Sequence, residues 1–437
     1  MANCTTGMVQ FPRLKHRVLE VNFGGGEVSS DGGLLLLREA DRRLKLTERV
    51  AAVLDDPRDP ERITHPLLDL IRQRIYAIVQ GYEDLNDHSA LRDDALLQSV
   101  LDRAEPLGSA PTLCRLENRA SRAAAWALQR ELIETFIASF KEPPAELVLD
   151  FDATDDPLHG KQEGGFFHGY YDCYCYLPLY VFCGEQLLVS YLRPSKIDGA
   201  KHAWAILSLL VKRLRQAWPE VRLILRADSG FCRHRMLSWC ERNAVGYCVG
   251  LAQNARLNAM TQAHRQRLAV QFAATQTQQR EFTEVRYGAH TWQAERRVIA
   301  RLEHSDKGDN PRYIVTNLTG EGASLYDDLY CARGEMENRI KEAQLGLFAD
   351  RTSCHHFVVN QFRLLLSSLA YVLVERLRAL ALAGTEFARL QATTLRTKLF
   401  KIGAVIVRNT RRVRVMLSSS YPYQEIFHRA ALALRSP

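Results

Sequence analysis

The spacing of apolar residues divides the chain into a helical start, an alternating middle and a helical end. Between residues 34 and 140, apolar side chains recur three or four residues apart, and Pro66 and Pro111 open two of the runs. Such spacing is typical of amphipathic helices. We therefore predict a mostly helical region over residues 1–145, which ends at the Pro143–Pro144 pair.

The pattern changes after that proline pair to short apolar runs separated by turn residues. These runs predict strands at 146–152, 170–182, 187–192, 221–227 and 245–251, and helices at 200–218 and 233–242. In the resulting order, β-β-β-α-β-α-β, two hairpin-linked strands follow the first strand before helices alternate with strands. This order matches the mixed sheet of an RNase H-like core. We therefore predict an α/β fold, with the first part of that core over residues 146–251.

The signals weaken over residues 252–323, where strands are expected at 291–302 and 312–318 with a polar loop between them. A β-rich insertion fits this segment best. Helical periodicity resumes at 324 and dominates the rest of the chain. We predict that a helix within 324–350 completes the core and that residues 351–437 form a helical C-terminal region.

The distribution of charge points to a polyanionic partner. The chain of 437 residues carries a net charge of +8. Residues 351–437 hold 14 Lys or Arg against 3 Asp or Glu, a net charge of +11, which leaves −3 for the rest. Positive charge gathered at one end of a folded protein is expected where nucleic acid binds.

Composition and hydropathy narrow the class of protein further. With 46% hydrophobic and 25% charged residues the chain is expected to be globular. Charged residues interrupt the apolar stretch 362–382, which predicts a buried helix and no membrane span. The N-terminus has no long apolar segment for export, and the ten cysteines form no Cys-x-x-Cys pair. We therefore expect a cytoplasmic protein with reduced cysteines.

Three carboxylates occupy positions suited to metal-dependent chemistry. Asp152 ends the first predicted strand, Asp228 ends the fourth, and Glu337 lies on the later helix. The first and fourth strands are neighbours in an RNase H-like sheet, so acids at their ends can share a metal. Two Mg²⁺ ions roughly 3.5–4 Å apart can activate an attacking oxygen and stabilise the leaving oxygen of a phosphodiester. We predict that these three acids are catalytic and hold two Mg²⁺, with Mn²⁺ as a substitute.

Neighbouring acids offer alternatives to this triad. Asp150 points to the same side of the strand as Asp152, and it is the alternative acid, although we favour Asp152. Glu335 and Glu342 lie near Glu337 on the same predicted helix. Surface helices carry several acids that are merely solvated, so Glu337 is distinguished only by the motif around it.

That motif consists of four residues, Tyr330, Arg333, Glu337 and Gln344, whose spacing places them on one helical face. It resembles the Tyr-x2-Arg-x3-Glu-x6-Lys signature of DDE-type insertion-sequence transposases that carry a β-strand insertion before the last acid. Gln344 stands in place of the family's Lys and can still hydrogen-bond. Asp152-Ala-Thr and Arg-Ala-Asp228-Ser-Gly-Phe are similar to the family's motifs for the first and second acids.

Further segments resemble one branch, the insertion sequence thirteen-eighty family. They begin at Gly81 (Gly-Tyr-Glu-Asp-Leu-Asn-Asp-His), Leu91 (Leu-Arg-Asp-Asp), Pro111 (Pro-Thr-Leu-Cys-Arg-Leu-Glu-Asn) and His168 (His-Gly-Tyr-Tyr). The resemblance implies binding to terminal inverted repeats, cleavage at the ends of the element and strand transfer into target DNA. It implies DNA contacts by Tyr330, Arg333 and Gln344. We expect a homodimer on DNA, because two element ends must be brought together.

Other candidates for DNA contact lie outside the core. The C-terminal region carries a cluster of Arg408, Arg411, Arg412 and Arg414, whose density favours phosphate contacts over base reading. The arginine-bearing stretches 38–49 and 111–130 are either recognition helices for the repeats or ordinary solvated faces. For Trp292 the resemblance implies a flipped base stacked on an aromatic residue, and strand packing is the alternative.

Three functions are compatible with these patterns. The first is an active transposase. The second is an RNase H-fold nuclease that cuts without joining strands. The third is an inactive DNA-binding derivative, which predicts that one acid is missing or misplaced. All three candidate acids are present, which favours the first.

Overall fold

The computed structural model describes residues 7–435 and divides into two compact units. The first, the helical unit, comprises Met1–Ala120, Gly346–Phe348 and Leu369–Pro437. The second, the sheet unit, comprises Ser121–Leu345 and Ala349–Ser368. Each unit is therefore assembled from separate stretches of the chain.

The helical unit contains most of the helices that the apolar periodicity predicts. They are α1 (Leu34–Leu44), α2 (Leu46–Ala52), α3 (Leu67–Gln80), α4 (His88–Leu91), α5 (Ala95–Val100), α6 (Ala110–Asn118), α15 (Ala392–Leu395) and α16 (Gln424–Arg435). Short 3-10 turns η1 (Pro60–Arg62) and η2 (Leu85–Asp87) and π-helical turns η7 (Arg378–Leu382) and η8 (Arg396–Phe400) join them. Leu37, Ile71 and Leu399 are among the side chains that have no exposure in this unit.

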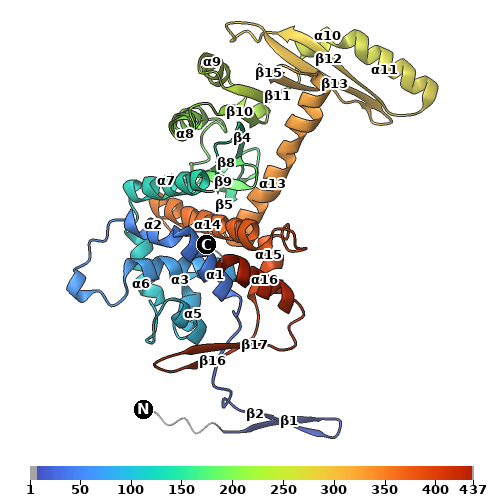
Figure 1. Ribbon diagram of the computed structural model, residues 1–437. Coiled ribbons are helices and arrows are strands. Elements are labelled where there is room, and N and C mark those ends of the chain that lie inside the picture. The colour runs from blue at the N-terminus through green and yellow to red at the C-terminus, as the bar shows by residue number, and fades with distance from the viewer. Residues whose placement is uncertain (1–6, 436–437) are drawn as a thin grey trace. The chain divides into compact units, whose positions relative to one another are not determined.

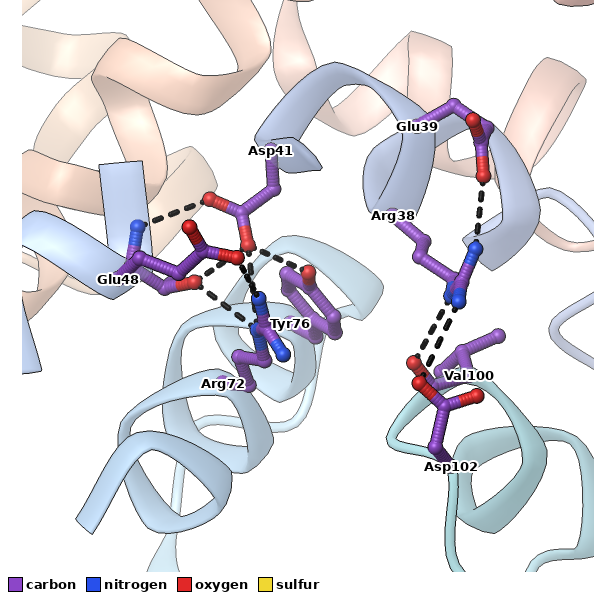
Figure 2. Close-up of polar contacts among 9 residues, drawn as sticks. Arg38, Glu39, Asp41, Glu48, Arg72, Tyr76, Val100 and Asp102 are labelled. Carbon is purple, nitrogen blue, oxygen red and sulfur yellow. Dashed lines mark hydrogen bonds and ion pairs between the residues drawn. The ribbon is translucent and has the colours of Figure 1, made fainter. Parts of the chain in front are cut away.

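A buried polar cluster joins α1, α2 and α3 around Asp41 (Figure 2). The Asp41 carboxylate accepts hydrogen bonds from the Thr47 backbone N–H at 2.9 Å and from the Tyr76 hydroxyl at 2.7 Å. Arg72 approaches it to 3.5 Å and also contacts Glu48 at 3.1 Å. Burial, with the neighbouring Asp41, raises the pKa of Tyr76 well above its usual range. The cluster therefore satisfies a buried acid of α1 with donors from α2 and α3.

Strands at both ends of the chain differ from the helical regions expected there. They are β1 (Val9–Leu14), β2 (Arg17–Val21), β3 (Glu27–Ser29), β16 (Ala404–Arg408) and β17 (Val413–Leu417). β1 pairs with β2, while β3, β16 and β17 form a three-stranded antiparallel sheet in the order β17-β16-β3. β3, with three residues, is too short to show a strand pattern. β16 and β17 are five-residue runs rich in β-branched residues around a polar turn, a hairpin signal that the prediction of a helical region did not use.

The sheet unit is organised around a nine-stranded mixed sheet. Its strands are β4 (Glu146–Ala153), β8 (Leu179–Cys183), β9 (Gln186–Tyr191), β10 (Arg222–Ala227), β11 (Gly246–Leu251), β12 (Gln279–Tyr287), β13 (Arg296–Ser305), β14 (Gly308–Asp309) and β15 (Arg312–Thr316). They follow the order β12-β13-β15-β11-β10-β4-β8-β9, with β14 beside β13. β4, β10 and β11 are parallel, β8 is antiparallel to β4, and β9 is antiparallel to β8. The predicted RNase H-like arrangement is confirmed.

Helices cover one face of this sheet and a helical turn covers part of the other (Figure 1). On the first face, α7 (Arg122–Ala138), α8 (Ala203–Ala217) and α9 (His234–Arg242) pack against buried strand residues such as Phe151 and Leu225. On the second face, Cys248, Ile299 and Ile314 pack against Tyr326. A small separate sheet, β5 (Asp156–Pro157), β7 (Cys173–Tyr176) and β6 (Phe166–His168), lies in the loop between β4 and β8.

The segment 252–323 contributes the expected strands and also two helices that the sequence does not predict. α10 (Ala255–Met260) and α11 (Gln262–Thr275) bury only Leu257 and Leu268. With so few buried positions, no apolar stripe marks them as helices. The strands join the core sheet directly, because β15 pairs with β11.

The helix that follows this segment changes pitch several times before it ends. It comprises α12 (Gly322–Ser324), the π-helical turn η4 (Leu325–Tyr330), the 3-10 turn η5 (Cys331–Arg333), α13 (Gly334–Lys341) and the π-helical turn η6 (Glu342–Gly346). A 3-10 turn η3 (Ser229–Phe231) follows β10. Changes of pitch in mid-helix are frequent at functional sites.

One described helix has the length and composition of a membrane span. It covers Phe357–Leu382, includes α14 (Phe357–Leu377), and has a mean hydropathy of 1.6. Of its most apolar window, 89% is buried inside the protein. That burial is as expected for the core helix that the sequence predicts.

Candidate active site

The two predicted aspartates lie side by side at the carboxyl edge of the parallel strands. β4 and β10 pair in register, with Phe151 opposite Ala227. Asp152 and Asp228 are the next residue on each strand. The Asp228 carboxylate also caps η3, where it accepts a hydrogen bond from the Gly230 N–H at 2.9 Å. Strand pairing therefore brings together two acids that are 76 residues apart in the sequence.

Glu337 joins this pair through an arginine. The Arg333 guanidinium donates to Asp152 at 3.0 Å and to Glu337 at 3.2 Å, and thus bridges the first and third predicted acids. Arg333 is largely buried. Although burial alone would lower the pKa of Arg333, the charge of Asp152, with smaller contributions from Tyr330, Asp228 and Glu337, raises it.

The Asp152 carboxyl group lies in a strongly perturbed environment. Its side chain is only 14% exposed. Burial raises the pKa of Asp152 to about 6, Arg333 opposes this shift, and Asp228 and Glu337 add to it. A buried acid surrounded by other acids holds more negative charge than its protein partners neutralise. Perturbed carboxyl groups of this kind are frequent in active sites.

Asp150, the alternative acid, forms a buried ion pair. It is fully buried, and Arg226 clasps both of its oxygens, with an Nη2–Oδ2 distance of 2.7 Å. Arg226 also donates to the Leu329 carbonyl at 2.5 Å, which ties β10 to the helix that bears Glu337. Asp150 is thus neutralised by a buried partner and has no access to the carboxyl edge.

Tyr330 lies against the backbone of the second acid. A Cβ atom placed on Gly250 would lie 2.6 Å from the Tyr330 hydroxyl and 2.8 Å from the Ser229 nitrogen. Only glycine leaves room for this close approach. Burial raises the pKa of Tyr330 to about 12, with Asp228 among the contributing charges and Arg333 opposing. Tyr330 therefore keeps its proton and supports the loop that carries Asp228.

The family model for transposase DDE domain group 1 matches residues 11–436. The chain belongs to this family. It is a transposase, an enzyme that cleaves DNA and transfers the cut strands. Among solved structures, the piggyBac transposase synaptic complex with hairpin DNA is similar at a TM-score of 0.40 and 9% identity. That similarity covers 85% of this chain and 79% of the other. No curated protein matches the chain.

The donor set of the transposase fits a hard divalent cation, although its acids are not gathered as a closed cage. Within residues 7–435, no group of three or more His, Cys, Asp or Glu is close enough to hold a metal ion as it stands. The guanidinium of Arg333 supplies positive charge between Asp152 and Glu337. Burial, the main cause of the raised pKa of Asp152, and the two neighbouring acids disfavour its charged form, which a bound cation would favour. Carboxylate oxygens are the ligands that Mg²⁺ prefers.

Gln344, which replaces the signature lysine of related transposases, is held inside the protein. Its Nε2 donates to the backbone carbonyl of Asp155 at 2.9 Å. Gln344 is half-buried, and the hydrogen bond joins the end of the helix to the loop that follows β4. This hydrogen bond gives Gln344 a structural role. The predicted contact of Gln344 with DNA stays a prediction.

The four C-terminal arginines lie on the β16–β17 hairpin instead of a helix. Arg408 is bound to Glu27, with an Nε–Oε2 distance of 2.9 Å, and to Gln98. Arg411, Arg412 and Arg414 are exposed. Three of the four predicted cations are therefore free to meet DNA, whereas Arg408 holds the hairpin to β3.

Trp292 packs inside the protein. Its ring lies 5.6 Å from that of Tyr287 in an edge-to-face arrangement, and the Arg296 guanidinium lies 4.9 Å from its centroid. These contacts support the packing alternative for Trp292.

An aromatic group that our sequence analysis did not single out for the site lies closer to the acids. Tyr171 is within electrostatic reach of Asp155 and Asp152, which, together with burial, raise its pKa to about 12. The neighbouring Tyr170 is 84% exposed. Both tyrosines belong to the His-Gly-Tyr-Tyr motif, which is the sequence signal that could have pointed to Tyr171 as a residue near the site.

Proposed function

We propose that this transposase binds the terminal inverted repeats of an insertion sequence and catalyses metal-dependent cleavage and strand transfer. In this proposal Asp152, Asp228 and Glu337 are the metal ligands. The observation that carries it is the parallel register of β4 and β10, which sets the first two acids side by side. The bridge from Arg333 to Asp152 and Glu337 adds the third acid to the group.

The three carboxylates would hold Mg²⁺, or Mn²⁺ in its place. When bound, two such ions would activate the attacking water or 3′-hydroxyl and stabilise the leaving oxygen of the phosphodiester. Arg333 orients the carboxylates of Asp152 and Glu337 and offsets their repulsion. Tyr330 supports the backbone beside Asp228. These residues keep the acids close together before DNA and metal arrive.

DNA would be held by cations outside the catalytic edge. Arg411, Arg412 and Arg414 are exposed on one hairpin and suit phosphate contacts. The arginines of α1 fit this role less well, since Arg38 bonds to the Val100 carbonyl at 3.1 Å and to Glu39 at 2.8 Å (Figure 2). Two copies of the chain would act together, because both ends of the element must be held. The enzyme would act in the cytoplasm, where DNA is within reach.

The test is an assay that separates binding, cutting and joining. Purified protein is incubated with a supercoiled plasmid carrying the element's own ends, with Mg²⁺ or with EDTA, and the products are mapped on denaturing gels. The proposal predicts Mg²⁺-dependent cuts at the ends and joined products. Cuts without joined products would favour a nuclease, and a shifted but uncut plasmid would favour an inactive DNA-binding derivative.

A further inference from the structure

The first hairpin of the chain, β1–β2, is exposed on all sides. Every residue of β1 and four of the five residues of β2 are exposed, and Phe11 shows 50% of its surface. An isolated two-stranded hairpin is marginally stable in water. A ribbon that no core supports is therefore expected to find a partner outside its own unit.

The charge on the hairpin indicates what that partner is. Its tip reads Arg13-Leu14-Lys15-His16-Arg17, which places three permanent cations within five residues. Lys15 adopts a left-handed conformation with φ of 56° at the turn. Within residues 7–435, none of the three charged groups has a hydrogen-bond or ion-pair partner. Unpaired cations crowded at a tip are suited to phosphates.

The topology brings the base of this hairpin to the same end of the sheet as the β16–β17 turn. β3 runs antiparallel to β16, with Glu27 opposite Ile406. The chain that precedes Glu27 therefore leaves the sheet where β16 enters its turn at Asn409–Arg412. The link between β2 and β3 contains Gly24, Gly25 and Gly26, and a Cβ on either of the last two would meet nothing within 4 Å. The link can thus adjust the direction of the hairpin.

We infer that β1–β2 is a DNA-binding arm that contacts the duplex together with the tip of β16–β17. This inference rests on the proposed function, since the DNA is the end of the element. The major groove of a duplex admits a two-stranded β-ribbon. A second copy of this chain is a poorer partner for the tips, because the cations of the hairpin would meet like charges on Arg411, Arg412 and Arg414.

The test measures how the affinity for DNA depends on salt. Fluorescence anisotropy follows the full chain binding to a labelled duplex that carries the element's terminal sequence, without metal, across a NaCl series. Each phosphate contact contributes about 0.9 to the slope of log K against log salt, so R13A/K15A/R17A is expected to lower the slope by about 2–3. The matched control is K141A/K212A/R242A, which removes three exposed cations of the sheet unit and should leave the slope unchanged.

A second variant, F11S/V21S, tests the alternative that the hairpin binds another copy. Light scattering of wild type and variants gives the mass in solution. If the arginine–lysine variant keeps the wild-type slope, the inference is overturned. It is also overturned if R13A/K15A/R17A binds DNA like the wild type while F11S/V21S halves the mass of the protein in solution, because the hairpin would then bind another copy of the chain.

The measurement is independent of the proposed chemistry. A wild-type protein that never cuts DNA but loses slope in R13A/K15A/R17A would contradict the proposed function and support the arm. If the wild-type protein cuts and joins DNA but R13A/K15A/R17A keeps the wild-type slope, the proposed function is supported and the arm is contradicted.

Discussion

Asp41 in the helical unit and Asp152 in the sheet unit are both buried carboxylates, but their neighbours differ in sign. Asp41 receives hydrogen bonds from Thr47 and Tyr76 and an ion pair from Arg72 (Figure 2). Asp152 has Arg333 as a partner, but it also faces Asp228 and Glu337. The first site is satisfied by the protein alone. The second combines burial with two neighbouring acids, so a cation bound there would be stabilised.

The same contrast occurs within a single strand. Asp150 and Asp152 are two residues apart on β4 and point to the same side. Arg226 neutralises Asp150, whereas Asp152 extends to the carboxyl edge. Burial alone therefore does not distinguish a structural acid from a candidate catalytic acid. The balance of neighbouring charges and donors does, and each prediction below changes that balance at one position.

The largest effect on stability is expected at Asp150. In Asp150→Ala the Arg226 charge is left buried without its partner, which should lower the free energy of unfolding by about 3–5 kcal/mol. Glu146→Ala is the matched control. It removes an ion pair between the same two strands, but Arg222 and Glu146 are more exposed, so the expected cost is below about 1 kcal/mol. Urea denaturation measures both. A stable Asp150→Ala protein that no longer cleaves DNA would make Asp150 the catalytic acid.

A smaller effect, of opposite sign, is expected from Asp152→Asn in metal-free protein. The pKa of Asp152 is about 6 in the folded chain, against an ordinary value of 3.8, so the folded state binds the proton more tightly. The stabilisation from this proton is complete below about pH 3.8 and is lost as the pH rises through 6. The asparagine variant should therefore be more stable than wild type at about pH 8, by up to about 3 kcal/mol.

The measurement is thermal or urea unfolding of both proteins from about pH 4 to about pH 8 in EDTA, then with Mg²⁺. Mg²⁺ should stabilise the wild type at high pH and leave Asp152→Asn nearly unchanged. Parallel pH profiles for the two proteins would show that the carboxyl group carries no excess charge.

Tyr76→Phe should cost about 1.5 kcal/mol, because the Asp41 carboxylate loses a buried hydrogen bond. Tyr180 provides the control. Its hydroxyl is buried and has no hydrogen-bond partner among the described residues, so Tyr180→Phe should be neutral or slightly stabilising. Equal costs in the two variants, measured by urea denaturation, would mean that the Asp41 cluster adds nothing specific.

The smallest effect is expected from Gln344→Ala. Loss of the hydrogen bond to the Asp155 carbonyl should cost about 1 kcal/mol of stability and leave DNA affinity unchanged. Anisotropy with labelled duplex DNA measures the affinity. A drop of tenfold or more would restore Gln344 to the DNA-binding surface.

The core of the sheet could be predicted because each of its strands leaves a local signal. The strands before Asp152 and Asp228 are short apolar runs bounded by turns. They are neighbours in the sheet although β8 and β9 lie between them in the sequence, as the RNase H-like order requires. The charge partners could not be predicted in the same way. Arg226 meets Asp150 only because β10 pairs with β4, and no local pattern records that contact.

The strands at the two ends of the chain show a second limit of prediction from sequence. Residues 27–29 form a strand only by pairing with 404–408, and three residues are too few to reveal a strand on their own. The same pairing places Arg408 against Glu27 and removes it from the set of free cations. The arginine cluster could be recognised in the sequence. Which of its arginines are paired within the protein and which are exposed depends on long-range contacts.

The central claim is that Asp152, Asp228 and Glu337 form the metal-dependent cleavage centre. It is tested most directly by the rate of plasmid cleavage per folded molecule in Asp152→Asn, Asp228→Asn and Glu337→Gln. Glu335→Gln is the control, because Glu335 is an exposed acid of the same helix, paired with Arg339. The account predicts a loss on the order of 10³-fold or more for each of the three, with DNA binding retained, and near wild-type cleavage for the control. Wild-type rates in any of the three would contradict it.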